Sequence, residues 1–184
     1  MRRIWVLVFV GLIAQLACAA AQETPSQEGS VAPAGTASAT LAGKAGSGAS
    51  GSVAFHAMAG GVHIEAKVAG VPPGSHGFHL HETGDCSAPD FSSAGGHFNP
   101  AAVEHGGPEA AVHHAGDAGN LEVGPDGTGT LSLHSSQLAI GEGPNAVVGR
   151  AVILHENADD LTTQPTGNAG GRLACGVVSA AATP

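Results

Sequence analysis

Histidines dominate the residues of this sequence that could do chemistry. The chain has 11 histidines in 184 residues, and most of them fall between Gly74 and Asp117. His79 and His81 are two residues apart, so on a strand their side chains project from one face and can reach one ion together. Neutral imidazole suits copper and zinc, and a carboxylate such as Asp117 fits zinc better than a copper ion that changes oxidation state. The pattern predicts a metal cluster.

The cluster continues along the chain beyond this pair. Its further histidines are His97, His105, His114 and, much later, His155. A lone histidine is most often a solvent-exposed or hydrogen-bonded side chain. Applied to the whole set, that interpretation would leave many polar rings without a structural task. Metal binding accounts for all of them together.

Short strands must supply the framework for these side chains. Residues 53–56 and 62–69 alternate between apolar and polar side chains, which predicts half-buried antiparallel strands. The 29 glycines and 11 prolines favour short strands and turns over long helices. Further strands are predicted at 37–42, 77–82, 121–123, 127–133, 147–154 and 174–179. The predicted fold class is all-β: an eight-stranded antiparallel Greek-key sandwich or barrel with two long functional loops.

The two long loops are predicted at 83–118 and 156–173, where strand patterns are missing. Long ordered loops in a compact domain are usually functional. We therefore expect the chemistry to lie in or beside these two segments.

The N-terminal segment has the pattern of an export signal. Arg2 and Arg3 precede an apolar run at 4–14, which is shorter than the about 20 residues that a membrane-spanning helix needs. We expect a signal peptide at 1–21, a flexible linker at 22–36 and one folded domain at 37–184, in the periplasm or elsewhere in the cell envelope. A lipid anchor at Cys18, which would make the chain a membrane-anchored lipoprotein, stays an alternative, although Gln15 stands where the lipoprotein pattern prefers leucine.

Cysteine use and charge agree with export. Excision or acylation of Cys18 would leave Cys86 and Cys175 as the only pair, and an even pair in an exported chain implies a disulfide. Without residues 1–21 the chain has four basic residues against 15 acidic ones, a formal charge of −11. Nucleic acid is therefore not an expected partner.

Several histidine- and glycine-rich motifs stand in an order that is typical of one known family. The motifs are HGFHLHE (76–82), GGHFNP (95–100), HGGP (105–108), HHAGDAGN (113–120), LHENADDL (154–161) and GNAGGRLACGV (167–177). In these motifs the sequence resembles the copper/zinc superoxide dismutase family, over about residues 37–180. The resemblance implies an enzyme that converts superoxide into oxygen and hydrogen peroxide at a copper ion bridged to zinc.

The resemblance also implies which residues hold the two metals. The copper ligands would be His79, His81, His97 and His155, and the zinc ligands would be His97, His105, His114 and Asp117. His97 would bridge the two ions and also carry a proton for the reaction. Asp159 would join His79 to His105 and orient both rings.

Arg172 and Thr166 match residues on opposite sides of the family's copper channel. A fixed cation near the metal is what an anionic substrate needs. Cys86 and Cys175 match the family's disulfide, which would hold the first long loop to the last strand beside Arg172. Because residues 156–171 contain no lysine or arginine, we expect attraction of superoxide to rely mainly on Arg172 and the metals, with a weak dependence on salt.

The other histidines are expected to lie outside the metal centre. His76 fits a structural position behind the copper ligands, and His113 should point away from the zinc. His56, His63 and His134 are expected to face solvent.

Two other interpretations of the same motifs stay open. The domain could buffer copper and zinc without turnover, although Arg172 beside an open copper face argues against this. It could also be a zinc-only structural or adhesive domain, although every copper position is filled. The sequence leaves open whether the chain forms a homodimer and how copper is delivered.

Overall fold

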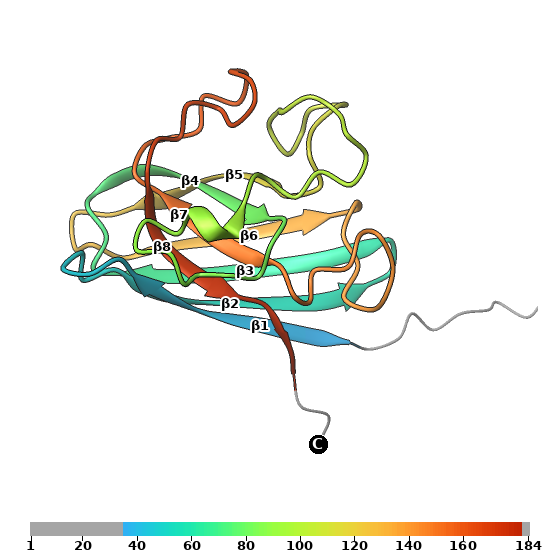
Figure 1. Cartoon of the computed structure of the whole chain (residues 1–184), viewed down its shortest axis with the longest axis horizontal. Coiled ribbons are helices and arrows are strands. Elements are labelled where there is room, and N and C mark those ends of the chain that lie inside the picture. Colours follow the sequence, from blue (N-terminus) through green and yellow to red (C-terminus); the bar gives the residue numbers. More distant parts are fainter. Residues whose placement is uncertain (1–34, 182–184) are drawn as a thin grey trace, which may run out of the picture. The chain divides into compact units, whose positions relative to one another are not determined.

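Antiparallel strands build the part of the chain that the structure describes, residues 35–181 of a computed structural model (Figure 1). The strands are β1 (Thr36–Gly43), β2 (Ser50–Met58), β3 (Gly61–Ala69), β4 (Gly74–His81), β5 (Asp117–Val123), β6 (Gly129–Ser135), β7 (Ala151–His155), β8 (Arg172–Val177) and β9 (Ser179–Ala180). A short 3-10 helix, η1 (Ser92–Ala94), lies between β4 and β5. Within residues 35–181, no helix is long and apolar enough to cross a membrane.

The strands close into a barrel. Their order is β2-β3-β6-β5-β4-β7-β8-β1, and β1 pairs back onto β2, while the two-residue β9 adds to β1. Neighbours such as β3 and β6 are not consecutive in sequence, so the chain crosses over in the manner of a Greek key. The predicted all-β, eight-stranded antiparallel fold is confirmed, with one short additional strand.

The alternation in the sequence decides which side of each strand faces the core. Val53 and Phe55 on β2 and Val62 and Ile64 on β3 are fully buried, because successive side chains on a strand point to opposite faces. The two strands join through a two-residue turn in which Gly60 has a φ of 82°, a left-handed conformation that favours glycine. Burial of large apolar side chains in this core supplies the main favourable free energy of folding.

Most strand boundaries differ from the prediction by one to four residues, and three of these differences are the starts of β5, β7 and β8. Strand β7 begins at Ala151, because the preceding Val147 enters the core from a turn and its amide bonds to the carbonyl of Ala139. Strands β5 and β8 begin earlier than predicted, at Asp117 and Arg172. Both residues were expected in loops, and the structure instead fixes them at strand ends.

The two long loops lie on one side of the barrel, as Figure 1 shows for the segments after β4 and β7. The amide of His105 in the first loop donates to the side-chain oxygen of Gln164 in the second, at 2.8 Å. The side-chain NH₂ of Gln164 donates in turn to the carbonyl of His105, at 2.9 Å. These bonds hold the loops together where most of the clustered histidines lie. The predicted signal peptide (1–21) and all but the last two residues of the predicted linker lie outside the described residues.

Candidate metal centre

Seven buried side chains form two groups that share one member. Each group has its potential ligand atoms within 4.8 Å of one another. The first consists of His79, His81, His97 and His155, and the second of His97, His105, His114 and Asp117. These are the two sets that were predicted as metal ligands, and His97 is the residue that belongs to both.

Strands β4 and β7 position the first group. His79 and His81 lie on the same side of β4, and β7, which pairs with β4, ends at His155. His97 reaches the group from the first loop, where it forms an isolated bridge with His81. The side chains therefore come from two paired strands and one loop.

Hydrogen bonds indicate which ring nitrogens carry lone pairs in this group. Nδ1 of His81 lies 2.9 Å from the carbonyl oxygen of Gly95, and Nδ1 of His155 lies 3.4 Å from that of Gly170. A carbonyl only accepts, so each neutral ring places its proton on Nδ1 and its lone pair on Nε2. The two Nε2 atoms face each other at 3.3 Å. Two nitrogens that each lie about 2.0–2.1 Å from a tetrahedral ion would be separated by roughly this distance.

Asp117 organises the second group. Its carboxylate oxygens lie 2.7 Å from Nδ1 of His97, 3.1 Å from Nδ1 of His105 and 3.2 Å from Nδ1 of His114. The carboxylate also accepts the backbone amides of His114 (2.8 Å) and Gly106 (3.2 Å). Burial alone would raise the pKa of Asp117, but hydrogen bonding and the nearby rings outweigh burial and hold that pKa well below its usual value. An ionised carboxylate with three imidazoles is a donor set that suits zinc.

Four buried ring nitrogens have no hydrogen-bond partner among the described residues: Nδ1 of His79, Nε2 of His97, and Nδ1 of His105 and His114. Leaving a buried polar atom unpaired costs about 1–3 kcal/mol. These four atoms belong to the two groups, so a cation at the centre of each group would satisfy all of them. The donor sets therefore fit two metal ions.

Asp159 connects the two groups from behind. One carboxylate oxygen accepts Nε2–H of His79 at 2.8 Å, and the other accepts Nε2–H of His105 at 3.0 Å. Both rings consequently keep their lone pairs on Nδ1, which turns toward the centres of the groups. Gly167 makes room for this contact: a Cβ there would lie 2.7 Å from Nε2 of His105 and closer still to Asp159. The structure thus places Asp159 where the sequence predicted a link between these two histidines.

Burial keeps three rings of the first group, those of His79, His81 and His155, neutral. Desolvation is the largest cause that lowers the pKa of His81 to about 2 and that of His155 to about 4, and the neighbouring His97 lowers both further. The pKa of His79 is likewise well below its usual value, first through burial and then through His97 and His155. Neutral imidazoles have the free lone pairs that metal ions require.

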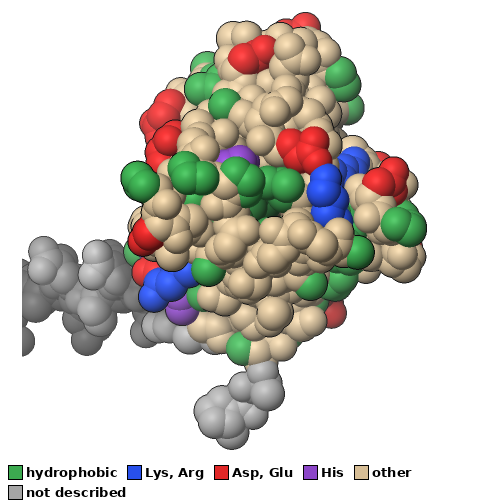
Figure 2. Space-filling model, turned by 90° about the vertical axis from the view of Figure 1, so that its left-hand side faces the viewer, with side chains coloured by type: hydrophobic (Ala, Val, Ile, Leu, Met, Phe, Trp, Pro, Cys, Tyr) green, Lys and Arg blue, Asp and Glu red, His purple; other side chains and the backbone are tan. Residues whose placement is uncertain are grey.

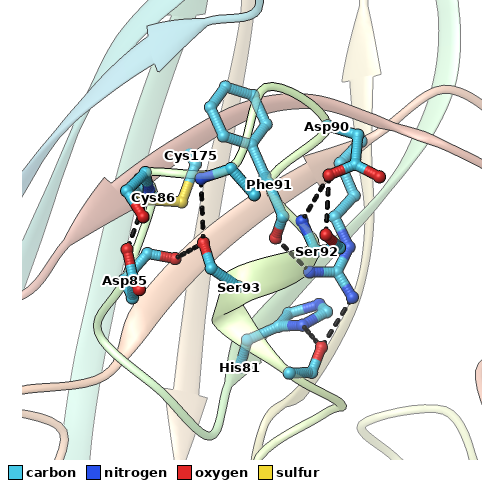
Figure 3. Close-up of a disulfide and its surroundings, with 12 residues drawn as sticks. His81, Asp85, Cys86, Asp90, Phe91, Ser92, Ser93 and Cys175 are labelled. Carbon is cyan, nitrogen blue, oxygen red and sulfur yellow. Dashed lines mark hydrogen bonds between the residues drawn. A yellow bond between two sulfur atoms is a disulfide. The ribbon is translucent and has the colours of Figure 1, made fainter.

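Arg172 lies beside the first group. Its guanidinium donates to the carbonyl oxygens of Phe91 and Gly95, the latter at 2.6 Å (Figure 3). Because Gly95 also accepts from Nδ1 of His81, one carbonyl holds both the cation and a ring of the metal centre. Arg172 is only partly buried and lines a hollow of about 450 Å³.

A disulfide holds the segment that carries these carbonyls. Cys86 in the first loop is bonded to Cys175 on β8, with Cα atoms 5.9 Å apart, which confirms the predicted pair (Figure 3). Cys175 is part of a small second core with Phe91, Ala94 and Ile153, and Cys86 packs against this core. The covalent bond and this core together fix the loop against β7 and β8.

Sequence reasoning missed Lys44, which lines the same hollow as Arg172. Its ammonium forms an ion pair with the carboxylate of Glu156, and Asp90 also lines this hollow. The local charges therefore nearly cancel, and Figure 2 shows acidic side chains beside the few cationic ones on one face. The predicted Thr166 lines a different hollow, of about 700 Å³, together with His97 and His114.

Two histidines outside the groups have other contacts. The ring nitrogens of His76 lie 2.9 Å from the carbonyl oxygens of His155 and Pro72, so this residue supports the turn behind the first group. Nδ1 of His113 lies 2.8 Å from the carbonyl of His114, and its Nε2 faces the amide of Gln137 at 2.9 Å. Both arrangements match the structural places expected for them.

Comparisons with known proteins agree with this geometry. The family model for copper/zinc superoxide dismutase matches residues 49–178. Among solved structures, the clock protein EA4 is similar, with 37% sequence identity and a TM-score of 0.73. The match covers 82% of this chain and 98% of that one. The residues matched by the family model include β2 to β8 and both long loops.

Proposed function

The chain belongs to the copper/zinc superoxide dismutase family, and from this premise we propose that it converts superoxide into oxygen and hydrogen peroxide. Copper would be held by His79, His81, His97 and His155, and zinc by His97, His105, His114 and Asp117. Bound copper supplies the one-electron redox chemistry, which zinc does not have. The observation that carries the proposal is that His97 belongs to both groups, with Nδ1 beside Asp117 and Nε2 unpaired.

His97 has the geometry of a proton carrier in this reaction. Two superoxide ions and two protons give one oxygen and one hydrogen peroxide, so a proton must reach the departing peroxide. Nε2 of His97 can take up a proton while Nδ1 stays beside Asp117, and the ring then keeps its place between the groups. The hollow that His97 lines gives solvent a route to this side of the centre.

Arg172 would attract and orient the anionic substrate. Its guanidinium is held by two carbonyl oxygens, and one of them, that of Gly95, also accepts a hydrogen bond from His81. A preorganised cation needs little rearrangement when an anion arrives. The ion pair of Lys44 with Glu156 adds little net charge, which supports the expectation that steering relies mainly on Arg172.

We place the reaction outside the cytoplasm, as a protective activity. The signal pattern at 1–21 and the disulfide of Cys86 with Cys175 support an oxidising compartment.

The decisive experiment measures superoxide consumption by protein loaded with copper and zinc, beside a His155→Ala variant, with metal analysis of both. We expect fast turnover by the parent and its loss in the variant while zinc stays bound, because His155 belongs only to the first group. Full occupancy of both metals in the parent without turnover would refute the proposal and favour metal buffering.

A further inference from the structure

Three histidines outside the metal centre stand in one row across three neighbouring strands. His56 on β2 is directly opposite His63 on β3, and His63 is directly opposite His134 on β6. Directly opposed residues on antiparallel strands point to the same face, with Cβ atoms about 4.5–5.5 Å apart. On β2 and β3 the flanking residues Phe55, Val62 and Ile64 are buried and Ala57 is partly buried against the core, so the row lies on the outer face of the barrel.

The sequence alone predicted that these three side chains face solvent, and the structure confirms it. His56 and His134 are exposed, and the side chain of His63 is 29% exposed. Within residues 35–181, the rings of His56 and His134 form no hydrogen bond, so no structural task accounts for them. Their alignment became visible only with the strand register, because 71 positions separate His63 from His134 in the chain.

A carboxylate lies beside the row. Glu65 is the next outward residue on β3, and its Oε1 is 3.5 Å from Nε2 of His63. It is opposite Ala54 on β2 and Ser132 on β6, whose small side chains leave space above the sheet. The Ser132 hydroxyl is 3.3 Å from Nε2 of His63. The row therefore places three imidazoles and one acid side by side on the outer face of β2, β3 and β6.

We propose that His56, His63 and His134, with Glu65, form a third and exchangeable site for a divalent transition-metal ion. Imidazole favours copper, zinc and nickel, and binding strength for such ligands rises to a maximum at Cu²⁺. The acidic composition of the chain adds a general attraction for cations. None of the strands β2, β3 and β6 contributes a ligand to the two inner groups, so the third site is independent of the proposed catalysis.

The expected affinity is lower than that of the inner groups. Within the described residues, only the two inner groups already have their ligand atoms converged. The rings of the outer row must rotate to meet an ion, and ordering exposed side chains has an entropic cost. His63 can share a metal ion with either neighbouring histidine, whereas His56 and His134 are two strand spacings apart, about 10 Å. Loss of His63 should therefore weaken binding more than loss of either outer histidine.

The test titrates Cu²⁺, and separately Zn²⁺, into protein whose two inner groups have first been saturated, and follows binding by calorimetry and by NMR of the histidine rings. We expect one further equivalent to bind, with shifts of the ring signals of His56, His63 and His134. His63→Gln should lower the affinity by at least about tenfold, the lower end of what loss of a metal-site partner costs. His56→Gln and His134→Gln should each lower it less.

Two controls separate this site from general binding to histidine. His113→Gln removes a histidine outside the row and should leave the third equivalent unchanged. Superoxide consumption by His63→Gln should equal that of the parent. The metal titration itself does not depend on whether the proposed function is correct. Absence of a third equivalent, or an equal loss of affinity in His113→Gln and His63→Gln, would overturn the proposal.

Discussion

The inner and outer histidines of this barrel show how the same side chain is prepared for different degrees of metal binding. The inner rings are buried, and several of them have one nitrogen fixed by a backbone carbonyl or by Asp159. In the outer row His56 and His134 are exposed, and within residues 35–181 the ring of His63 has polar partners only in Ser132 and Glu65. A fixed second nitrogen decides where the lone pair points before any ion arrives.

The difference shows that histidine count alone says little about a metal site. Burial lowers the pKa of His79, His81 and His155, and the hydrogen-bond partners of the inner rings reduce the conformational entropy that metal binding must remove. The rings of the outer row are less buried and have no such partners on a backbone carbonyl or on Asp159. The following predictions test how burial, fixed partners and the surrounding loop prepare the inner groups.

The largest effect is expected from loss of the disulfide, because it holds the loop that carries Gly95, the partner of His81 and Arg172. Cys86→Ser should reduce the free energy of unfolding by about 2–5 kcal/mol, as removal of a native disulfide from a small secreted domain commonly does. Denaturant unfolding of the metal-free protein measures it. The chemically reduced parent serves as the matched control and should show a similar loss; an unchanged midpoint in both would mean that the second core alone holds the loop.

Acid should destabilise the metal-free protein through the buried rings. Because the folded-state pKa of His155 is lowered to about 4, the unfolded state binds more protons than the folded state between about pH 6.5 and 4. Stability is therefore lost as pH falls through this window, by up to about 3 kcal/mol for His155. Unfolding curves at several pH values should show a shallower loss for His155→Gln. An identical slope in parent and variant would contradict the claim that burial keeps this ring neutral.

Removal of the acceptor behind the inner rings should bring them closer to the behaviour of the outer row. Asp159→Ala takes the partner from both His79 and His105, and affinity for metal should fall about 10–100-fold, as with other residues that orient ligands. Competition with a chelator measures this. The matched control is Asp160→Ala, since the exposed Asp160 carboxylate bonds only to Thr162 and Thr163 within the described residues. Equal metal retention in the two variants would show that burial alone prepares the site.

The smallest effects concern the approach of the anion rather than the metal itself. Arg172→Ala should lower kcat/KM about tenfold at low salt, whereas Lys44→Gln should change it by less than about fivefold, because Lys44 is partly exposed and already paired with Glu156. Turnover measured over a range of ionic strength checks both. Unchanged kcat/KM in Arg172→Ala would remove this residue from the steering role.

The sequence predicted the strands because they depend on local patterns, and the same patterns predicted a metal cluster, whereas the division of its ligands into two groups came from the family resemblance. Alternation in residues 62–69 predicts β3, and the spacing of His79 and His81 places both rings on one face. The outer row was not predictable, because it depends on the register of β6 against β3, which follows from the closed barrel. Lys44 was missed for the same reason, since the turn after β1 meets Glu156 only through the pairing of β1 with β8.

Membership of His97 in both inner groups has a thermodynamic consequence. An ion in one group alters the position and charge of the ring that the other group must use, so the two occupancies are coupled. Such coupling is reciprocal: whatever factor zinc imposes on copper affinity, copper imposes on zinc affinity. Loading in either order must reach the same final free energy, while the partly loaded intermediates differ in how long they survive.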